Sequence, residues 1–325
     1  MIPDFTKGAA VELARRARNK GALPPMTWKP DIVIYHSPCD DGFGAAWAAW
    51  KRWGDSVEYV PATYGKPAPD VAGKNVLMAD FSYKLAELDQ LAASTASIVI
   101  LDHHKSALAE LEPYRFTESG SGAISADDIA DMLRVLHERD RSPVIAIFDM
   151  DRSGARMTWD FCHPGQEAPE LIRMIEDRDL WRFDILETRA FSLWLRSHRY
   201  DFHTWSRIAA QLDGDRDGIM AQAIAIEGFY DQKIAEIVTT ARWAKINNVP
   251  VPIANCTWAF ASDVAHELLI KHPEAAFAAT YYDRGDGSRT YSLRSEDERD
   301  DVSIHARRYG GGGHRNAAGF EVPAI

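Results

Sequence analysis

The chain has 325 residues, 46% hydrophobic and 26% charged, which is ordinary globular composition and excludes a disordered protein. Lysine and arginine number 37 against 48 acidic residues, and the resulting net charge of −11 argues against a general binder of long duplex DNA. The three cysteines, Cys39, Cys162 and Cys256, form no CxxC pair, so we expect no disulfide framework or zinc knuckle and a reducing, cytoplasmic location.

The N-terminal segment 1–29 lacks a continuous apolar core, which predicts neither a signal peptide nor a membrane span, and residues 6–20 fit a short helix. From residue 30, apolar β-branched runs alternate with helical patterns, which is typical of a parallel sheet covered on both faces. We expect strands at 31–36, 57–62, 75–81, 97–104 and 144–149, and helices at 42–54, 83–94, 120–142, 153–162 and 169–181.

The second half of the chain is mostly helical from 185 to 242, and short strands return after a turn at 247–250. We expect these strands at 251–256, 275–283 and 289–295, a helix at 262–271, and a last strand after the glycines at 310–313. The predicted fold class is α/β, in four parts: an N-terminal helical extension at 1–29, a parallel-sheet domain at 30–190, a helical connector at 191–242 and a smaller α/β domain at 243–325.

Acidic and histidine residues follow three of the strands predicted for the first domain. They are His36 with Cys39, Asp40 and Asp41 after the first strand, Asp80 after the strand at 75–81, and Asp102, His103 and His104 after the strand at 97–104. Ligands of open parallel sheets bind outside the carboxyl ends of the strands, so we expect these side chains to converge. Asp177 and Asp179, at the end of the helix at 169–181, are further candidates.

Converging carboxylates need cations or protons, because each pair 4 Å apart repels by about 4 kcal/mol at an effective dielectric of 20. Two divalent ions would balance the charges of Asp41, Asp80, Asp102 and Asp177. Imidazole and carboxylate donors without thiolate favour manganese or magnesium over structural zinc. Taken alone, Asp80 has the alternative of a turn cap and His36 that of a core histidine, whereas the Asp-His-His triplet favours a metal site.

Glycines also precede a histidine near the C-terminal end, in the run Gly311, Gly312, Gly313, His314. Such a run is usually a flexible linker, but here a predicted strand follows it, and glycines let backbone amides approach an anion closely. Arg294, in the strand at 289–295, is a candidate for holding a carboxylate or phosphate through its guanidinium fork.

Together these motifs resemble the DHH phosphoesterase superfamily with its C-terminal DHH-associated domain. The motifs are HSPCDDG (36–42), MADF (78–81), LDHH (101–104), SGA (153–155), IEDRDLW (175–181) and GGGH followed by AAG (311–319). They span about residues 30–325 in the order typical of the family. The most similar members are nanoRNases and other oligonucleotide phosphodiesterases related to RecJ-type exonucleases.

The resemblance implies a two-manganese centre, with magnesium as the alternative metal. Its ligands would be His36, Asp41, Asp80, His103 and Asp177, with Asp80 bridging the two ions. Asp102 would orient the cluster, either as a metal ligand itself or from just outside the coordination shell, and His104 would contact the scissile phosphate or assist its leaving oxygen. Arg294, the glycines 311–313 and His314 would hold a terminal phosphate or nucleotide.

The first motif departs from the family pattern. The family places aspartates four and six residues after the histidine, whereas Asp40 and Asp41 stand four and five residues after His36. Aligning on Asp41 puts Cys39 where the first aspartate is usual, so Asp40 and Cys39 are both open as ligands of the first metal. The helix at 120–142 resembles an insertion.

We therefore expect a metal-dependent phosphodiesterase that hydrolyses short single-stranded oligonucleotides or dinucleotides, or chain ends, to nucleoside monophosphates by two-metal water attack. A cyclic-dinucleotide phosphodiesterase, or a pyrophosphatase or polyphosphatase with the same centre, is the alternative within the hydrolases. A nucleotide-binding or RNA-binding module without catalysis is the alternative of another class. The sequence leaves open RNA against DNA and the oligomeric state, a homodimer included.

Overall fold

The computed structural model describes residues 27–116, 124–139 and 141–323. The helix expected at 6–20 lies outside the described residues, as does the start of the helix expected at 120–142. The chain divides into two compact units, 1–103 with 107–224 and 104–106 with 225–325.

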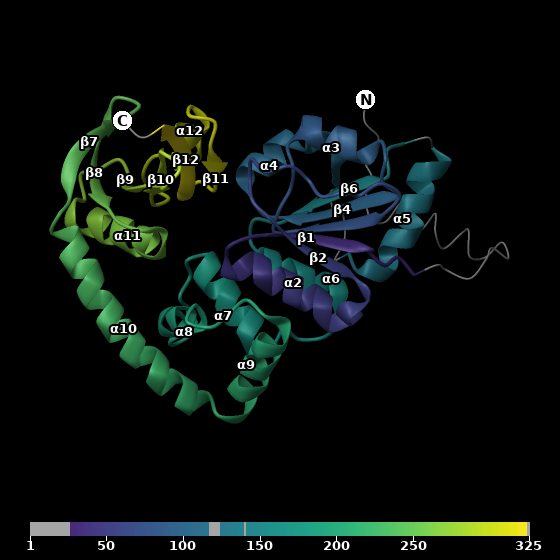
Figure 1. The fold of residues 1–325 in the computed structure, drawn as a ribbon, viewed down its shortest axis with the longest axis horizontal. Coiled ribbons are helices and arrows are strands. Elements are labelled where there is room, and N and C mark those ends of the chain that lie inside the picture. Colours follow the sequence, from purple (N-terminus) through teal and green to yellow (C-terminus); the bar gives the residue numbers. More distant parts are fainter. Residues whose placement is uncertain (1–26, 117–123, 140, 324–325) are drawn as a thin grey trace. The chain divides into compact units, whose positions relative to one another are not determined.

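The first unit is built on a sheet of parallel strands in the order β2-β1-β3-β4-β6-β5 (Figure 1). The strands are β1 (Ile32–His36), β2 (Glu58–Ala62), β3 (Asn75–Ala79), β4 (Ser97–Asp102), β5 (Arg115–Phe116) and β6 (Val144–Phe148). The chain runs from β1 to β2 on one side and then returns to β3 on the other side of β1, so the winding reverses between β1 and β3. The predicted α/β class with a parallel sheet is confirmed.

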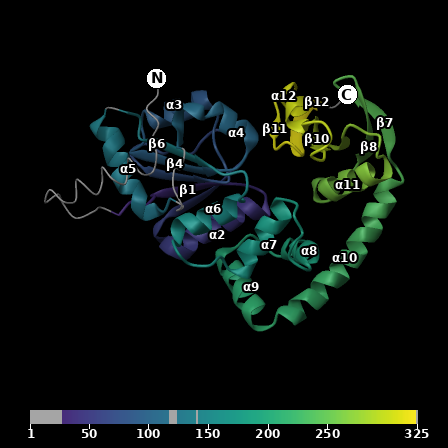
Figure 2. The same cartoon turned by 180° about the vertical axis from the view of Figure 1, so that it is seen from behind.

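Alternating side chains of the strands fill two separate cores. Val33 and Leu77 pack with α2 (Asp40–Trp53), α5 (Ala126–Glu138) and α6 (Gly154–Cys162). Their sequence neighbours Ile34 and Met78 pack on the opposite face. That face is covered by α3 (Leu85–Ala92), through its buried Leu88, and the view from behind shows α3 and α2 on opposite sides of the sheet (Figure 2). Both faces of the sheet are therefore buried, as the continuous apolar runs predict.

Further helices of the chain are α4 (Lys105–Glu110), α7 (Glu170–Asp179), α8 (Thr188–Leu195), α9 (Phe202–Gly214) and the long α10 (Arg216–Val238). The aromatic face of α2 packs on α9, where the Phe43 ring lies 5.1 Å from the ring of Phe202 and 4.7 Å from that of Trp205. Trp47, only 1% exposed, donates its indole N–H to Ser206. This residue belongs to the core. Within the described ranges, no helix has the length and apolar character needed to cross a lipid bilayer.

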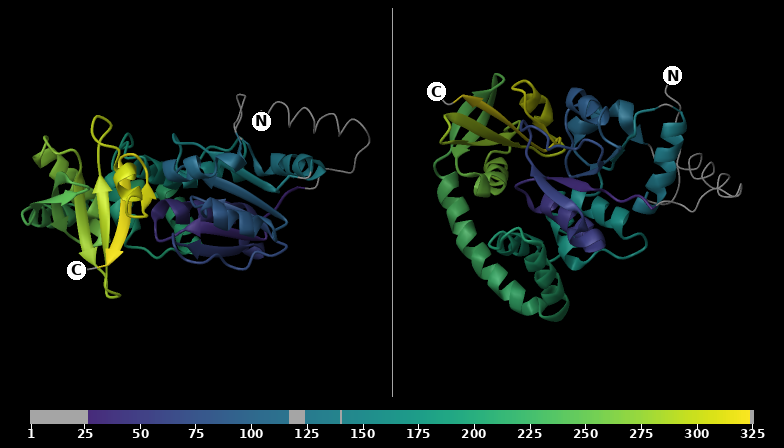
Figure 3. Two further views of the ribbon diagram at one scale, coloured as in Figure 1. Left: turned by 90° about the horizontal axis from the view of Figure 1, so that it is seen from above. Right: turned by 45° about the vertical axis from the view of Figure 1, so that its right-hand side comes forward.

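The second unit holds a mixed sheet in the order β11-β12-β10-β9-β8-β7, seen from another side in Figure 3. Its elements are β7 (Arg242–Ile246), β8 (Val249–Asn255), α11 (Ala261–Lys271), β9 (Ala278–Asp283), β10 (Ser288–Arg294), α12 (Val302–Arg307), β11 (Gly312–Gly313) and β12 (Ala317–Pro323). Strands β8 and β9 are parallel and the other pairs antiparallel. Strand β7 was not predicted from the sequence. It pairs with β8 through a two-residue turn in which Asn247 and Asn248 both have positive φ, the geometry of a type I′ hairpin.

Candidate metal centre

The predicted site residues of the first unit lie at the carboxyl ends of β1, β3 and β4. His36 is the last residue of β1, Asp80 follows β3 directly, and Asp102 ends β4 with His103 after it. β1 and β3 are the strands between which the winding reverses. Open parallel sheets bind their ligands at this position, because the connecting loops there separate to opposite faces and leave a crevice.

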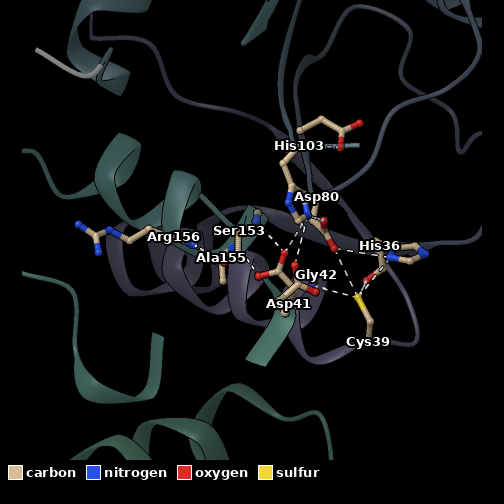
Figure 4. Close-up of polar contacts among 12 residues, drawn as sticks. His36, Cys39, Asp41, Gly42, Asp80, His103, Ser153, Ala155 and Arg156 are labelled. Carbon is tan, nitrogen blue, oxygen red and sulfur yellow. Dashed lines mark hydrogen bonds and ion pairs between the residues drawn. The ribbon is translucent and has the colours of Figure 1, made fainter. Parts of the chain in front are cut away.

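Among the described residues of the first unit, two groups of donor atoms meet at this point and share Asp80 (Figure 4). One group is Asp41, Asp80 and His103, and the other is His36, Cys39 and Asp80; within each, the donor atoms lie within 4.8 Å of one another. Oδ1 of Asp80 lies 3.1 Å from Nε2 of His103. Oδ2 lies 3.4 Å from Sγ of Cys39 and 3.5 Å from Nδ1 of His36. The two oxygens of one carboxylate thus face two different donor sets.

The backbone at Asp80 is held in an unusual conformation. Its φ is +55°, a left-handed value that aspartate tolerates better than most residues, and its amide donates to the carbonyl of Leu101 at 2.9 Å. Gly154, the first residue of α6, packs directly against it, since a Cβ placed there would lie 2.4 Å from Cβ of Asp80. A glycine at 154 is therefore needed for Asp80 to occupy its position.

Asp41 is held by the start of α6. Its two oxygens accept the backbone N–H groups of Gly154 at 2.6 Å and Ala155 at 2.9 Å. Ser153 caps the same helix by accepting the amide of Arg156 at 3.2 Å (Figure 4). Amides at a helix N-terminus have no partner within the helix and favour a negative charge, so this contact fixes the orientation of the carboxylate and acts to lower its pKa.

The electrostatics of the cluster fit a bound cation. Asp41 and Asp80 are 3% and 2% exposed. Burial raises the pKa of Asp41 well above its usual value, and the charges of Asp80 and Asp179 raise it further. Burial acts to lower the pKa of His103, but the hydrogen bond that its ring donates to Asp80 and the charges of the nearby carboxylates prevail and raise it to about 10. In the absence of metal a proton on His103 thus offsets the negative charge, and the oxygen, nitrogen and sulfur donors suit a divalent ion.

Asp102 has a positioning geometry. It is fully buried, its Oδ1 accepts the backbone N–H of His103 at 2.8 Å, and its Oδ2 accepts the hydroxyl of Ser82 at 2.8 Å. These bonds fix the backbone that carries His103.

The prediction of Asp177 as a metal ligand is not supported by its geometry. Its Oδ1 accepts the amide of Asp184 at 2.8 Å and its Oδ2 accepts that of Ile185 at 3.1 Å, so this carboxylate holds the loop after α7. Two residues later on the same helix, Oδ2 of Asp179 lies 3.6 Å from Nε2 of His103. The structure thus places Asp179, and not Asp177, beside the cluster.

Asp40 also faces away from the donor groups. Its Oδ2 accepts from Nε of Arg196 at 2.7 Å and its Oδ1 from the hydroxyl of Tyr200 at 3.0 Å. Neither partner could be found from the sequence, because both lie about 160 residues away along the chain and no motif links them to Asp40. Tyr64, which no sequence motif singles out, also lies beside the centre: its ring is 5.3 Å from that of His36 and 4.9 Å from that of Phe81.

The remaining predicted residues are grouped with the second unit. Arg294 ends β10, where its guanidinium donates to the carbonyl of Leu293 and to the hydroxyl of Ser262. Within the glycine run, Gly312 and Gly313 form β11 and pair with Gly319 and Ala318 of β12, so the run is not a linker. A Cβ at Gly311 would lie 2.0 Å from the carbonyl oxygen of Gly319, so the close strand pairing requires glycine there. His104 and His314 are both half-buried and belong to this unit as well.

Comparison with known proteins gives a distant set of relatives. No protein-family model matches the chain. The Uncharacterized protein R106 of Acanthamoeba polyphaga mimivirus is 29% identical over an alignment of 317 residues, and the match covers 91% of this chain and 68% of that protein.

Solved structures with some likeness include a pGpG-specific phosphodiesterase from Vibrio cholerae, with 11% identity and a TM-score of 0.43 over 90% of this chain and 93% of that one. An exopolyphosphatase-related protein from Bacteroides fragilis has 13% identity and a TM-score of 0.43, covering 98% of this chain and 92% of that one. CDC45 from Entamoeba histolytica has 8% identity and a TM-score of 0.43, covering 98% and 96%. At these TM-scores the likeness carries no argument about activity.

Proposed function

We propose that the protein is a phosphodiesterase that uses two divalent metal ions to hydrolyse short single-stranded oligonucleotides to nucleoside monophosphates. The observation that carries the proposal is the pair of donor groups that share the carboxylate of Asp80. A shared carboxylate is the arrangement that two-metal hydrolases use to hold both ions near one phosphoryl group. The motifs resembling DHH phosphoesterases support the same chemistry.

The ions, when bound, would polarise the phosphoryl oxygens and make water acidic enough to attack phosphorus at neutral pH. Asp80 would bridge them through its two oxygens, with Asp41 and His103 on one side and His36 on the other. Asp179 replaces Asp177 in the proposed ligand set, because its carboxylate lies beside His103. Manganese is the metal that the resemblance suggests for the centre, with magnesium as the alternative.

The other proposed roles concern this chain's own groups. Asp102 would keep His103 in place through the backbone bond already described. His104 would contact the scissile phosphate and deliver a proton to the leaving oxygen. Arg294, the glycines of β11 and His314 would bind the end of the substrate, which favours short molecules over long duplexes.

The test is hydrolysis of a substrate panel with manganese. The panel holds 5′-labelled RNA and DNA of two to about twenty nucleotides, cyclic dinucleotides and pyrophosphate, with products resolved over time. We expect the short linear oligonucleotides to be cleaved to monophosphates. Loss of a residue just outside the coordination shell typically costs up to about 100-fold in activity. Asp80→Asn removes a proposed ligand of both ions, so it should reduce turnover by more than this.

Other results would contradict the proposal in distinct ways. Preferential cleavage of cyclic dinucleotides or pyrophosphate would support the proposed metal chemistry but contradict the proposed oligonucleotide substrate. Oligonucleotide binding without turnover, at less than two ions per chain, would identify a binding module. Unchanged turnover in a folded Asp80→Asn protein would place the active site elsewhere.

A further inference from the structure

We propose that Cys39 is a thiolate ligand of one of the two metal ions, and that the His36–Cys39–Asp80 site therefore selects a softer ion, such as Zn²⁺ or Co²⁺, than the Asp41–Asp80–His103 site. This inference rests on the metal centre of the proposed function. It concerns the chemistry of one site and not the reaction catalysed.

The position of the sulfur is the first support. Sγ of Cys39 lies 3.2 Å from Nδ1 of His36 and 3.4 Å from Oδ2 of Asp80. These three atoms belong to three different side chains and form one of the compact donor groups of the described residues. A cysteine that served only to fill the core would have no reason to meet an imidazole nitrogen and a buried carboxylate oxygen at once.

The hydrogen bonds of the neighbouring Asp40 are the second support. Asp40 is the alternative ligand for this site, but a guanidinium and a phenol hydroxyl hold both of its oxygens. Its side chain is 10% exposed, and Arg196 neutralises its charge at 2.7 Å. Moving Asp40 to the metal would leave Arg196 without this partner. Cys39 therefore supplies the donor at the first motif, and Asp40 joins α2 to the segment after α8.

The helix start keeps the sulfur in place. Cys39 is the N-cap of α2, and its Sγ accepts the amide of Gly42 at 3.1 Å. Burial and the charges of Asp80 and Asp41 raise the pKa of the Cys39 thiol well above its usual value, and the amide hydrogen bond only partly opposes this, so the sulfur keeps its proton until a cation binds. On metal binding the thiol would release its proton to solvent and the sulfur–metal bond would form in its place, with no change of oxidation state.

Ligand softness then separates the two sites. Thiolate with imidazole favours zinc, cobalt or iron, whereas a site of carboxylates with one imidazole accepts manganese or magnesium. The protein would accordingly bind two chemically different ions when both kinds are supplied.

The test uses cobalt as a spectroscopic probe of the full-length protein. A thiolate bound to Co²⁺ gives an intense charge-transfer band in the near ultraviolet that carboxylate and imidazole ligands do not give. We expect this band in the wild-type protein and its loss in Cys39→Ser and Cys39→Asp, with Co²⁺ and Zn²⁺ affinity at this site reduced by at least about 10-fold. Serine and aspartate both retain the ability to cap α2, so either variant can fold.

Cys256→Ser is the matched control, because Cys256 is a buried free thiol of the second unit outside the donor groups. Its band should equal that of the wild type. A band that survives in Cys39→Ser, or two ions bound by the wild type without any such band, would overturn this inference while leaving the proposed function intact. Failure of the folded wild-type protein to bind any divalent ion would contradict both this inference and the proposed function.

Discussion

Asp177 and Asp179 stand two residues apart and have different partners. Both are acidic, both lie near the end of α7, and the family motif favours the first. The side chain of Asp177 is nevertheless bound to the amides of Asp184 and Ile185, whereas that of Asp179 approaches His103. Residues two positions apart on a helix point in directions about 200° apart, so only one of the pair can face the cluster.

This difference predicts opposite phenotypes for two conservative substitutions. Asp179→Asn should weaken metal binding about 10–100-fold with little change in the free energy of unfolding of the metal-free protein. Asp177→Asn should lower that free energy by about 1–3 kcal/mol, because its amide group cannot accept both backbone hydrogens. Metal titration and urea unfolding of the two metal-free variants measure both effects. The reverse pattern would restore Asp177 as the ligand.

Among the helices and strands, the contact between α6 and the end of β3 decides the geometry of the centre. Gly154 lets the start of α6 approach Asp80, and the same turn of helix supplies the amides that hold Asp41. One short helix therefore positions carboxylates that come from two different strand ends.

Gly154→Ala tests this contact. A methyl group 2.4 Å from Cβ of Asp80 must displace either the start of α6 or the end of β3. We therefore expect the free energy of unfolding to fall by about 1–3 kcal/mol and the metal affinity to fall as well, because Asp80 moves. Gly228→Ala is the control, because Gly228 lies within α10 with no atom within 4 Å of the added Cβ. It should stabilise the protein by about 0.5–1 kcal/mol without affecting metal binding. Calorimetry and metal titration of both variants provide the readout, and equal metal affinity in the two would contradict the role of Gly154.

At the scale of the whole molecule, the buried cluster should couple metal, pH and stability. The folded pKa of His103 is about 10 against 6.5 for the free side chain, so the metal-free fold binds more protons than the unfolded chain between these values. The stability contributed by protonated His103 is complete below about pH 6.5 and is lost as the pH rises toward 10.

We therefore expect the free energy of unfolding of the chelator-treated protein to fall between pH 7 and 10. With metal present, the ions replace the proton and should add about 2.7 kcal/mol for each site at an ion concentration of 100 Kd. Denaturant unfolding across this pH range, with EDTA or with Mn²⁺, measures both effects. His103→Gln serves as the control: it should lose the part of the slope due to His103, whereas the buried cysteines, whose pKa values are also raised, still contribute near pH 9. A slope of the same size in that variant would assign the pH dependence to another group.

The sequence by itself determined the α/β class, most strand positions and the gathering of His36, Asp41, Asp80 and His103. It could do so because apolar periodicity fixes the strands, and parallel strands bring their carboxyl ends to one edge whatever the details of packing. The hairpin strand β7 was not predicted, because the mostly exposed residues of this edge strand show little apolar periodicity.

Only the tertiary structure decided which of several adjacent acidic residues faces the cluster. Asp40 forms an ion pair with Arg196, and Asp177 accepts a backbone amide of the loop after α7. Cys39 lies within hydrogen-bonding distance of both His36 and Asp80. These choices depend on side-chain direction and on partners distant in sequence, and neighbouring residues of the same type carry no sequence signal that separates them. The chemistry of the centre is thus visible in the sequence, whereas the identity of its ligands is a property of the fold.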